Sequence, residues 1–551
     1  MNLIIKQLTF ICFTLISFLI LISCSIFNKK NESRYNAKIV NWQHKDLSED
    51  NIHGTSFEKW TNLNKKKKEN KEIVVAVIDT QIDLNHENLQ KQFWINQKEI
   101  PNNKIDDDGN GYIDDTNGWN FIGVSDNDII KDLSYEYVRY FREWDSIFKN
   151  KDEKTINNEG YEFKEYKRAD NFIKDQLNFY TYWKKSIIYN IELYDKAKDT
   201  LKHFFPNENY GVHQLDSLYN KYKINDKTFK ERRDDNDQDL GALIYLMKLN
   251  YEMNQRTLQD LIKVKNYIDS IINKKLNINY FDRFTLNLKK GCGNSLVNTK
   301  EYSHATEVTS TITSNNLKNN LGFSDYIKIM NLVVASSGDE HDNDIAMAIY
   351  YAVDNGAKVL NMSFGKEFSL KQEWVTEAFK YAEKNNVLIV HGSGNNRFDV
   401  DIKPYYPSDY DYNKKINVVS NFINVGSISK RTDSTMVSAF SNYGKKNVDL
   451  FAPGEDIYVA TPGNQYTYDS GTSLAAPMVS GTAALIWLYY PNLTVQEVKK
   501  IILESGVSID KKVVKPGTKN EMVPFSELCK SGKILNTYNA MKMAEEISKK
   551  K

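Results

Sequence analysis

The stretch with the clearest chemical potential is a Gly-Thr-Ser turn that opens a run of small and apolar residues. The run extends from Asp469 to Ala484 and places Ser473 at or beside the N-terminus of a predicted buried helix. Unpaired backbone N–H groups and the helix dipole favour negative charge at that end. A serine hydroxyl that attacks a carbonyl creates an oxyanion nearby, which this field would stabilise. The pattern predicts a nucleophilic serine, and the alternative is a core helix that merely begins with serine.

The segment Gly471–Pro477, Gly-Thr-Ser-Leu-Ala-Ala-Pro, resembles the nucleophile motif of the subtilisin-like serine proteases, or subtilases. Family members usually have Met where Leu474 stands. Pro477 cannot donate a hydrogen bond to the carbonyl four residues back. The resemblance implies two further motifs upstream, first one with Asp and then one with His. It also implies a serine endopeptidase that acts on protein or peptide substrates and needs no cofactor for catalysis.

A predicted strand leads to the Asp motif. Ile73–Ile78 is a continuous apolar and β-branched run, typical of a strand buried on both faces of a parallel sheet. Asp79 stands at its C-terminal end, where α/β folds place their sites. The stretch from Val75 to His86 resembles the subtilase Asp motif, with Gln81 where Gly is usual. Because positive φ is unfavourable for Gln, we expect the local turn to differ.

The His motif comes much later in the chain. Residues 303–310, Ser-His-Ala-Thr-Glu-Val-Thr-Ser, resemble the family pattern His-Gly-Thr-His-Val-Ala-Gly, and His304 aligns with the catalytic His. Ala305 replaces Gly, and Glu307 replaces the second His. A carboxylate near the imidazole is expected to raise its pKa. The resemblance implies that Ser473 attacks the carbonyl, His304 transfers the proton, and Asp79 orients the imidazole.

Beyond His304 the sequence alternates between predicted strands and helices. Strands are expected at 327–334, 358–364 and 387–391, with a helix at 344–355. The resemblance implies that two segments at the strand ends line the cleft and pair with extended substrate. These segments are Ser363, Phe364 and Gly365, and His391, Gly392 and Ser393.

Asn395 follows the second of these segments in a Gly-rich turn. It aligns with the side-chain donor of the family's oxyanion hole, and the backbone N–H of Ser473 would be the other donor. The alternative is an ordinary turn asparagine.

An acidic loop follows the Asp motif. Its carboxylates and amide recur at alternate positions, and Gly111 permits a sharp bend, as hard cations require. The loop resembles an EF-hand type, although position twelve is Asn117 instead of Glu. A structural Ca²⁺ is predicted, and the alternative is a solvated acidic turn. The expected ligands are Asp106, Asp108, Asn110 and Asp114.

The N-terminus has the features of an export signal. Lys6 precedes an apolar run from Leu8 to Ile22, and Leu-Ile-Ser-Cys ends at Cys24. This resembles the bacterial lipoprotein signal, which implies cleavage before Cys24 and acylation of that residue. Several acyl chains on one residue suffice for stable anchoring. We expect a lipid-anchored protein of the bacterial cell envelope, at the outer membrane or cell surface. The alternative is an uncleaved membrane helix.

These elements predict the organisation of the 551-residue chain. The fold class is α/β, a three-layer sandwich with a mostly parallel central sheet, carrying a large helical insertion. The helical periodicity, rich in Tyr and Lys, runs from about 124 to 300. The expected parts are a signal peptide at 1–23, an N-terminal extension at 24–72, a catalytic domain at 73–510 and a packed C-terminal tail at 511–551.

Composition adds few constraints. The net charge is +1, which gives no indication of a nucleic-acid partner. Of the four cysteines, Cys12 would be removed with the signal peptide and Cys24 would carry the lipid. Cys292 and Cys529 remain as an even pair in an oxidising compartment, which suggests a disulfide between them. The function predicted is a secreted, lipid-anchored serine endopeptidase. Two alternatives stay open: a catalytically weak binding protein with the same fold, motivated by Gln81, Ala305 and Glu307, and a maturation protease for one envelope partner.

Overall fold

The computed structural model describes residues 40–63, 71–125, 128–151, 160–282, 302–313 and 321–551, together with residue 296. The described chain forms two compact units. The smaller unit comprises Tyr137–Phe281, and the larger unit comprises the segments before and after it. The predicted signal peptide, Cys24 and Cys292 lie outside the described residues. Cys529 is buried with a free thiol, so its pairing stays a prediction.

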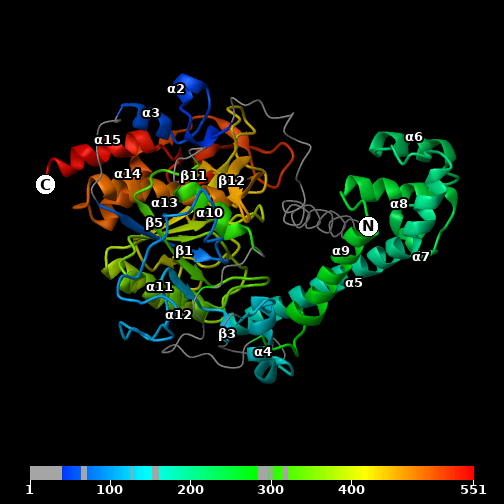
Figure 1. Ribbon diagram of the computed structural model, residues 1–551, viewed down its shortest axis with the longest axis horizontal. Helices are drawn as coiled ribbons and strands as arrows, with labels where there is room; N and C mark the ends of the chain where they lie inside the picture. The colour runs from blue at the N-terminus through cyan, green and yellow to red at the C-terminus, as the bar shows by residue number, and fades with distance from the viewer. Residues whose placement is uncertain are drawn as a thin grey trace. The chain divides into compact units, whose positions relative to one another are not determined.

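A nine-stranded sheet forms the centre of the larger unit (Figure 1). The strand order is β14-β17-β11-β10-β7-β6-β1-β5-β2. All neighbours are parallel except β14 and β17, which are antiparallel. The strands are β1 (Ile73–Asp79), β2 (Gly118–Asn120), β5 (Ile327–Val333), β6 (Val359–Met362), β7 (Leu388–Gly392), β10 (Phe422–Ile428), β11 (Leu450–Pro453), β14 (Val507–Ser508) and β17 (Lys533–Ile534).

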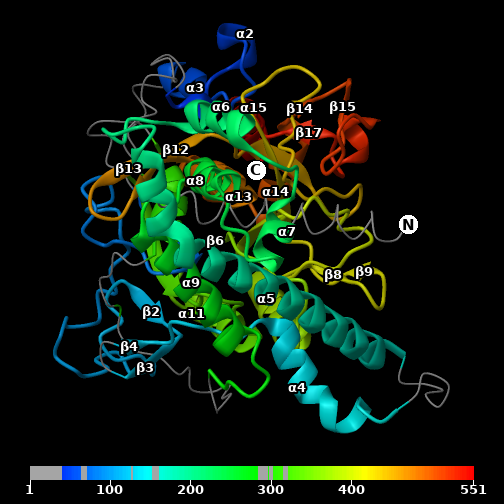
Figure 2. The ribbon, with the colours of Figure 1, turned by 90° about the vertical axis from the view of Figure 1, so that its right-hand side faces the viewer.

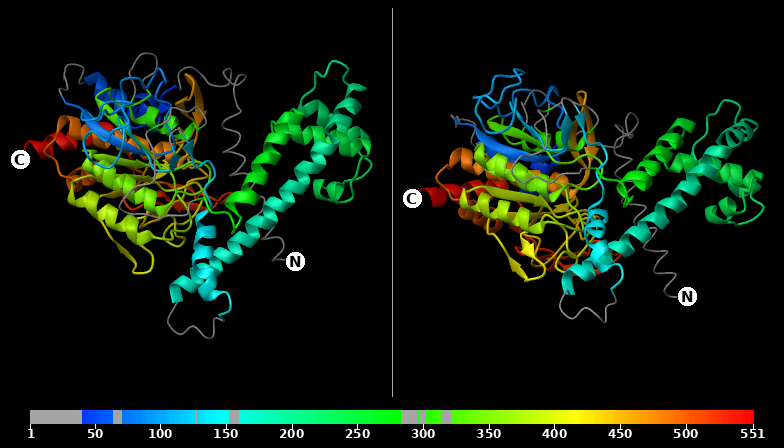
Figure 3. Two further views of the ribbon diagram at one scale, coloured as in Figure 1. Left: turned by 60° about the horizontal axis from the view of Figure 1, so that its bottom comes forward. Right: turned by 90° about the horizontal axis from the view of Figure 1, so that it is seen from below.

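Two helical layers cover the sheet, which confirms the predicted three-layer α/β sandwich (Figure 1 and Figure 3). One face packs against α10 (His304–Ile312), α13 (Thr472–Tyr489), α14 (Val495–Ser505) and α15 (Thr537–Ser548). The opposite face packs against α11 (Asp342–Asp354) and α12 (Gln372–Lys384). In β1, Val75 and Val77 enter the first core while Ala76 and Ile78 enter the second. This alternation explains why the strand is apolar throughout.

Helix α13 is the central helix of the first core. It packs against β1, β5, β6, β7, β10 and β11. Among the described residues, it is the helix long and apolar enough to cross a membrane, and most of it is buried inside the protein. Its apolar character is therefore accounted for by core packing.

Smaller elements complete the larger unit. The hairpins pair β3 (Gly123–Ser125) with β4 (Asp128–Ile129), β8 (Tyr410–Asp411) with β9 (Ile416–Asn417), β12 (Ile457–Thr461) with β13 (Gln465–Asp469), and β15 (Lys512–Val514) with β16 (Met522–Pro524). The N-terminal segment contributes α2 (Leu47–Asp50) and α3 (Phe57–Leu63). Trp42 and Phe57 are buried in the first core, and the indole N–H of Trp42 donates to the carbonyl of Asp456 at 3.1 Å.

The smaller unit is helical. Its 43-residue helix α5 packs along α8 and α9, as Figure 2 shows. Buried Asn190 and Asn250 hydrogen-bond to each other across α5 and α8. Buried Arg232 forms an ion pair with Asp237 at 3.2 Å. The helices are α4 (Glu136–Phe148), α5 (Gly160–Lys202), α6 (Val212–Tyr222), α7 (Phe229–Asp234), α8 (Leu240–Glu252) and α9 (Leu258–Ser270), followed by a π-helical turn at Ile271–Lys275.

Candidate active site

Asp79 and His304 meet although the whole helical unit separates them in sequence. Strand β1 ends at Asp79 and α10 begins at His304. The imidazole Nδ1 lies 2.8 Å from Oδ1 of Asp79, and the backbone N–H of Thr80 donates to the same oxygen at 2.6 Å. The Asp79 side chain is 1% exposed and that of His304 is 34% exposed. A carboxylate on Nδ1 fixes the ring orientation and leaves Nε2 for proton transfer.

The charges around His304 favour its protonated form. Burial lowers the pKa of the imidazole, but the carboxylates of Asp79, Glu307 and Asp469 outweigh burial and raise it to about 9. The side chains of Glu307 and Asp469 hydrogen-bond to each other, and burial followed by the charge of Asp469 raises the pKa of Glu307 well above its usual value. Glu307 thus lies near the imidazole, as the sequence suggested.

Ser473 lies in the first turn of α13 and is partly exposed. Helix α10, which carries His304, packs against α13. Within the described residues, Oγ of Ser473 and Nε2 of His304 make no hydrogen bond to each other. Such catalytic contacts are often long in the absence of substrate and tighten in the complex.

Asn395 is held by the residue that precedes Ser473. Its Oδ1 accepts hydrogen bonds from the backbone N–H and the hydroxyl of Thr472, at 2.9 and 3.0 Å. This orients the side-chain amide, and its Nδ2 has no acceptor among the described residues. A Cβ on Gly471 would lie 2.8 Å from Oγ of Ser473 and 3.4 Å from Nδ2 of Asn395. Oγ of Ser473 and Nδ2 of Asn395 therefore flank the same point.

The first predicted cleft segment follows β6, and the second comprises the last two residues of β7 and Ser393; β6 and β7 are adjacent strands. Several of their side chains point inward instead of toward a substrate. Ser363 donates to the carbonyl of Ser473 at 2.9 Å, and Ser393 is buried against the carbonyl of Asn442. Phe364 and Gly365 are partly exposed.

His391 has a structural position. Its Nε2 lies 2.8 Å from the carbonyl of Phe364, and its Nδ1 lies 3.2 Å from Oδ1 of Asn424. Burial lowers the pKa of its imidazole to about 4. Neighbouring Gly392 approaches the start of α13 closely, since a Cβ there would lie 3.0 Å from the carbonyl oxygen of Thr472. His391 and Gly392 thus join the cleft segments to each other and to α13.

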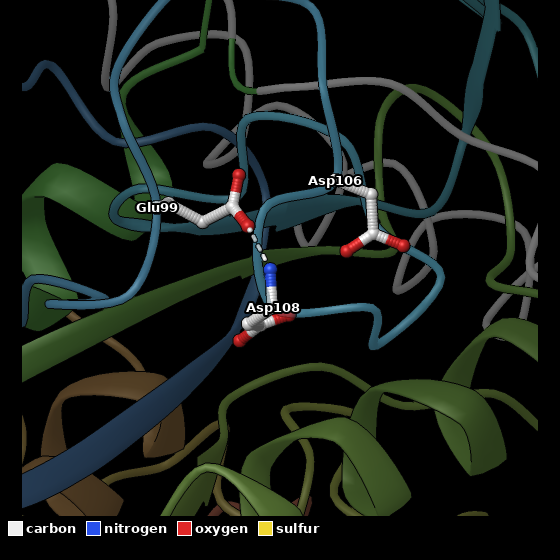
Figure 4. Close-up of side chains that lie close together, drawn as sticks. All are labelled: Glu99, Asp106 and Asp108. Atoms are coloured by element: carbon white, nitrogen blue, oxygen red, sulfur yellow. Dashed lines mark hydrogen bonds between the residues drawn. The ribbon is translucent and has the colours of Figure 1, made fainter.

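The acidic loop gathers only part of the predicted metal set. Glu99, Asp106 and Asp108 bring carboxylate oxygens within 4.8 Å of one another (Figure 4). Asp114 instead accepts the backbone N–H groups of Asn103 and Lys104. Asn110 also turns elsewhere: its Oδ1 accepts the N–H of Tyr112, and its Nδ2 donates to Asp115. Sequence spacing missed Glu99, which precedes the loop and accepts three backbone N–H groups from it.

A sequence model of the subtilase family matches residues 70–523. The chain belongs to the subtilase family. This match covers all three motifs and spans the helical insertion. It confirms the family that the nucleophile motif indicated.

Individual relatives align with parts of this subtilase. A thermophilic serine proteinase of Bacillus sp. strain AK1 is 38% identical over 144 residues, covering 26% of this chain and 31% of its own. Subtilisin DY of Bacillus licheniformis is 29% identical over 218 residues, covering 38% of this chain and 73% of its own. Subtilisin-like protease 2 of Plasmodium falciparum is 37% identical over 143 residues, which is only 10% of its length. The chain thus spans well under two thirds of several of these relatives.

Among solved structures, a cold-adapted subtilisin-like serine proteinase is 26% identical to this subtilase. The alignment covers 44% of this chain and 78% of that one, with a TM-score of 0.35.

Proposed function

We propose that this subtilase is a serine endopeptidase that uses Asp79, His304 and Ser473, with Asn395 and the backbone N–H of Ser473 as the oxyanion hole. The observation that carries the proposal is the 2.8 Å contact between Asp79 and His304 in a chain whose Ser473 and Asn395 flank one point. Motifs distant in sequence thus supply the orienting carboxylate, the base, the nucleophile and the amide donor, at or near the ends of β1, α10, α13 and β7.

The reaction follows from these positions. Neutral His304 accepts the proton of the Ser473 hydroxyl at Nε2 as Oγ attacks the substrate carbonyl. Asp79 stabilises the imidazolium through Nδ1, and Asn395 donates Nδ2–H to the oxyanion. His304 then returns the proton to the leaving amine. Water attacks the acyl-enzyme by the same route, which releases the acid and regenerates Ser473.

The test compares Ser473→Ala with the wild type. Casein hydrolysis and labelling by a fluorophosphonate should both disappear. Ser217→Ala, an exposed site on α6, is the matched control and should keep both. Hydrolysis that persists in Ser473→Ala would reject the proposed nucleophile.

The alternative, a binding protein with weak catalysis, has one specific observation in its favour. With a His304 pKa of about 9, only about one molecule in a hundred carries a neutral imidazole at pH 7. Labelling of the wild type by fluorophosphonate at pH 9 separates the two functions. An enzyme labels there, whereas a binding protein stays unlabelled.

Lipid anchoring at Cys24 in the bacterial cell envelope is proposed on the residues Leu-Ile-Ser-Cys and the preceding apolar run. Replacing Cys24 with Ser removes the thiol that would carry the acyl chain. We expect Cys24→Ser to move the protein from the membrane fraction to the soluble fraction, with Cys12→Ser as the control. An unchanged membrane fraction for Cys24→Ser would favour the uncleaved helix.

A structural Ca²⁺ is proposed at Glu99, Asp106 and Asp108. This set adds Glu99 to the predicted ligands and leaves out Asn110 and Asp114. The donors fit a hard cation because all are carboxylate oxygens, two from a tight loop and one from the segment that precedes it. The surroundings are also acidic: burial, together with the charges of Asp115 and Asp107, raises the pKa of Glu99. The ion would hold the loop that follows the Asp motif and would take no part in catalysis.

A further inference from the structure

We propose that Tyr405 fills the space that would receive the substrate side chain on the N-terminal side of the cleaved bond, and thereby restricts that side chain to a small one. The inference rests on the proposed endopeptidase function and names a determinant of its specificity.

The Tyr405 ring lies between the two cleft segments. A Cβ on Gly365, in the segment after β6, would lie 2.3 Å from Cε1 of the ring. A Cβ on Gly394, after β7, would lie 2.6 Å from the same atom. Real Cβ atoms do not come so close, so both glycines allow the phenol ring to occupy this space. The ring is partly buried and packs against the core residues of the C-terminal part of the sheet.

Backbone hydrogen bonds fix the ring in this position. The N–H of Lys366 donates to the carbonyl of Tyr406, and the N–H of Tyr406 donates to the carbonyl of Lys366, both at 2.8 Å. These two bonds join the residues that directly follow Gly365 and Tyr405 in the chain. The Lys366 side chain is itself 1% exposed and forms ion pairs with Glu136 at 3.0 Å and Asp342 at 2.8 Å. The segment that carries the ring is therefore not a freely moving loop.

The position of the reacting carbonyl decides which substrate residue meets the ring. The scissile carbonyl must reach Nδ2 of Asn395 and Oγ of Ser473. Asn395 directly follows Gly394, which touches the ring. A substrate paired with the Ser363–Gly365 segment as an added strand places the side chain of its carbonyl-bearing residue between that segment and Gly394. That is the space that Tyr405 occupies.

Three acidic residues lie close enough to the ring to act on it. The charges of Glu340, Glu367 and Asp339 act on Tyr405, and burial, before these charges, raises the pKa of its phenol. Burial likewise raises the pKa of Glu340 to about 8. Removal of the ring would therefore open a space whose potential is negative where these carboxyls are ionised. We expect the opened space to accept larger side chains, with basic ones favoured when these carboxyls are ionised.

The test is a series of peptides that vary only at the residue before the cleaved bond: Gly, Ala, Leu, Phe and Arg. Wild-type kcat/KM should be highest for Ala or Gly and at least tenfold lower for Leu, Phe and Arg. In Tyr405→Ala the ratio of Phe to Ala should rise at least tenfold, and that of Arg to Ala should also rise. Tyr405→Phe keeps the ring and should keep the wild-type order.

Tyr410→Ala is the matched control, because that ring packs against Tyr412 on the β8–β9 hairpin. It should leave the order unchanged. Efficient wild-type cleavage after Leu or Phe overturns the inference, even if Tyr405→Ala fails to fold. So does an unchanged order in a folded Tyr405→Ala. Fluorophosphonate labelling distinguishes failure of the proposed function from failure of this inference. Wild-type protein that does not label indicates that the proposed function is wrong. Labelled wild-type protein with a different order of kcat/KM among the peptides indicates that this inference alone is wrong.

Discussion

The hydroxyl of Ser363 donates a 2.9 Å hydrogen bond to the backbone carbonyl of Ser473. That carbonyl would ordinarily accept from the residue four positions later in α13, but this residue is Pro477, which has no N–H. Ser363 thus supplies the donor that the proline lacks. It also accepts from Asn361, whose own oxygen accepts from Ser480 of α13. The turn that carries Ser473 is thereby fixed to the end of β6.

Replacing Ser363 with Ala should leave that carbonyl without its donor. Loss of one hydrogen bond typically costs about 0.5–1.5 kcal/mol, so we expect a lower melting temperature by calorimetry and a reduced kcat. Ser363→Thr keeps the hydroxyl and should lose less. A melting temperature in Ser363→Ala equal to that of the wild type would contradict this support role.

Two substitutions of Asn395 separate the role of its side-chain oxygen from that of its side-chain nitrogen. Asn395→Ala removes both the donor and the acceptor for Thr472, whereas Asn395→Asp keeps the acceptor and removes the donor. Loss of one oxyanion donor typically lowers kcat by about 10²–10³. We expect Asn395→Asp to show such a loss with little change in KM or melting temperature. A donor role is excluded if Asn395→Asp retains wild-type kcat.

Activity should increase toward alkaline pH. The base must be neutral, and the pKa of His304 is raised to about 9, so activity is low below that pKa and rises through it. We expect kcat/KM, measured from pH 6 to 10, to show an apparent pKa near 9. Glu307→Gln combined with Asp469→Asn removes the charge shared by that pair and should lower the apparent pKa. Asp433→Asn, at an exposed turn, should not shift it.

Lys366 neutralises two buried carboxyls, Glu136 and Asp342. Burial raises the pKa of Asp342 to about 6 although Lys366 lowers it. Lys366→Met leaves both carboxyls without their cation, and removal of one partner from a buried pair costs about 3–5 kcal/mol. Lys380, paired with Glu377 at an exposed site, is the control, and Lys380→Met should cost less than about 1 kcal/mol. Equal melting temperatures for the two variants would contradict the prediction.

The calcium proposal predicts a chelator effect. Ca²⁺ should raise the melting temperature relative to excess EDTA, and Glu99→Gln should reduce that difference. Asp114→Asn is informative because the structure directs this carboxylate to backbone N–H groups. It should lower the melting temperature equally with and without Ca²⁺. An identical melting temperature in Ca²⁺ and EDTA for the wild type would end the proposal.

The sequence predicted the elements that carry the motifs well. Strand β1 was expected at 73–78 and ends one residue later, at Asp79. Helix α11 begins at Asp342, two residues before its expected start. These elements have strong local patterns, apolar runs for buried strands and a terminal glycine for the helix. The family match confirms the fold class that these patterns indicated.

The direction of individual side chains could not be predicted in the same way. Glu99 joins the acidic loop from outside its regular spacing, and Asp114 turns to the backbone instead. The Tyr405 ring packs against Gly365 and Gly394, which lie in the segments after two different strands. Each of these arrangements depends on how distant segments pack, and no periodicity within one segment encodes it.

The place of α13 late in the chain has a consequence for how the protein is made. Six strands of the sheet pack against this helix. Five of them end at least forty residues before the helix begins, and β11 ends shortly before it. Until α13 has been synthesised, the apolar face of the sheet that this helix covers stays exposed, and the growing chain is prone to aggregate. A protein shortened to end before α13 should therefore fail to accumulate in soluble form, because the last quarter of the sequence closes the core that the first quarter begins.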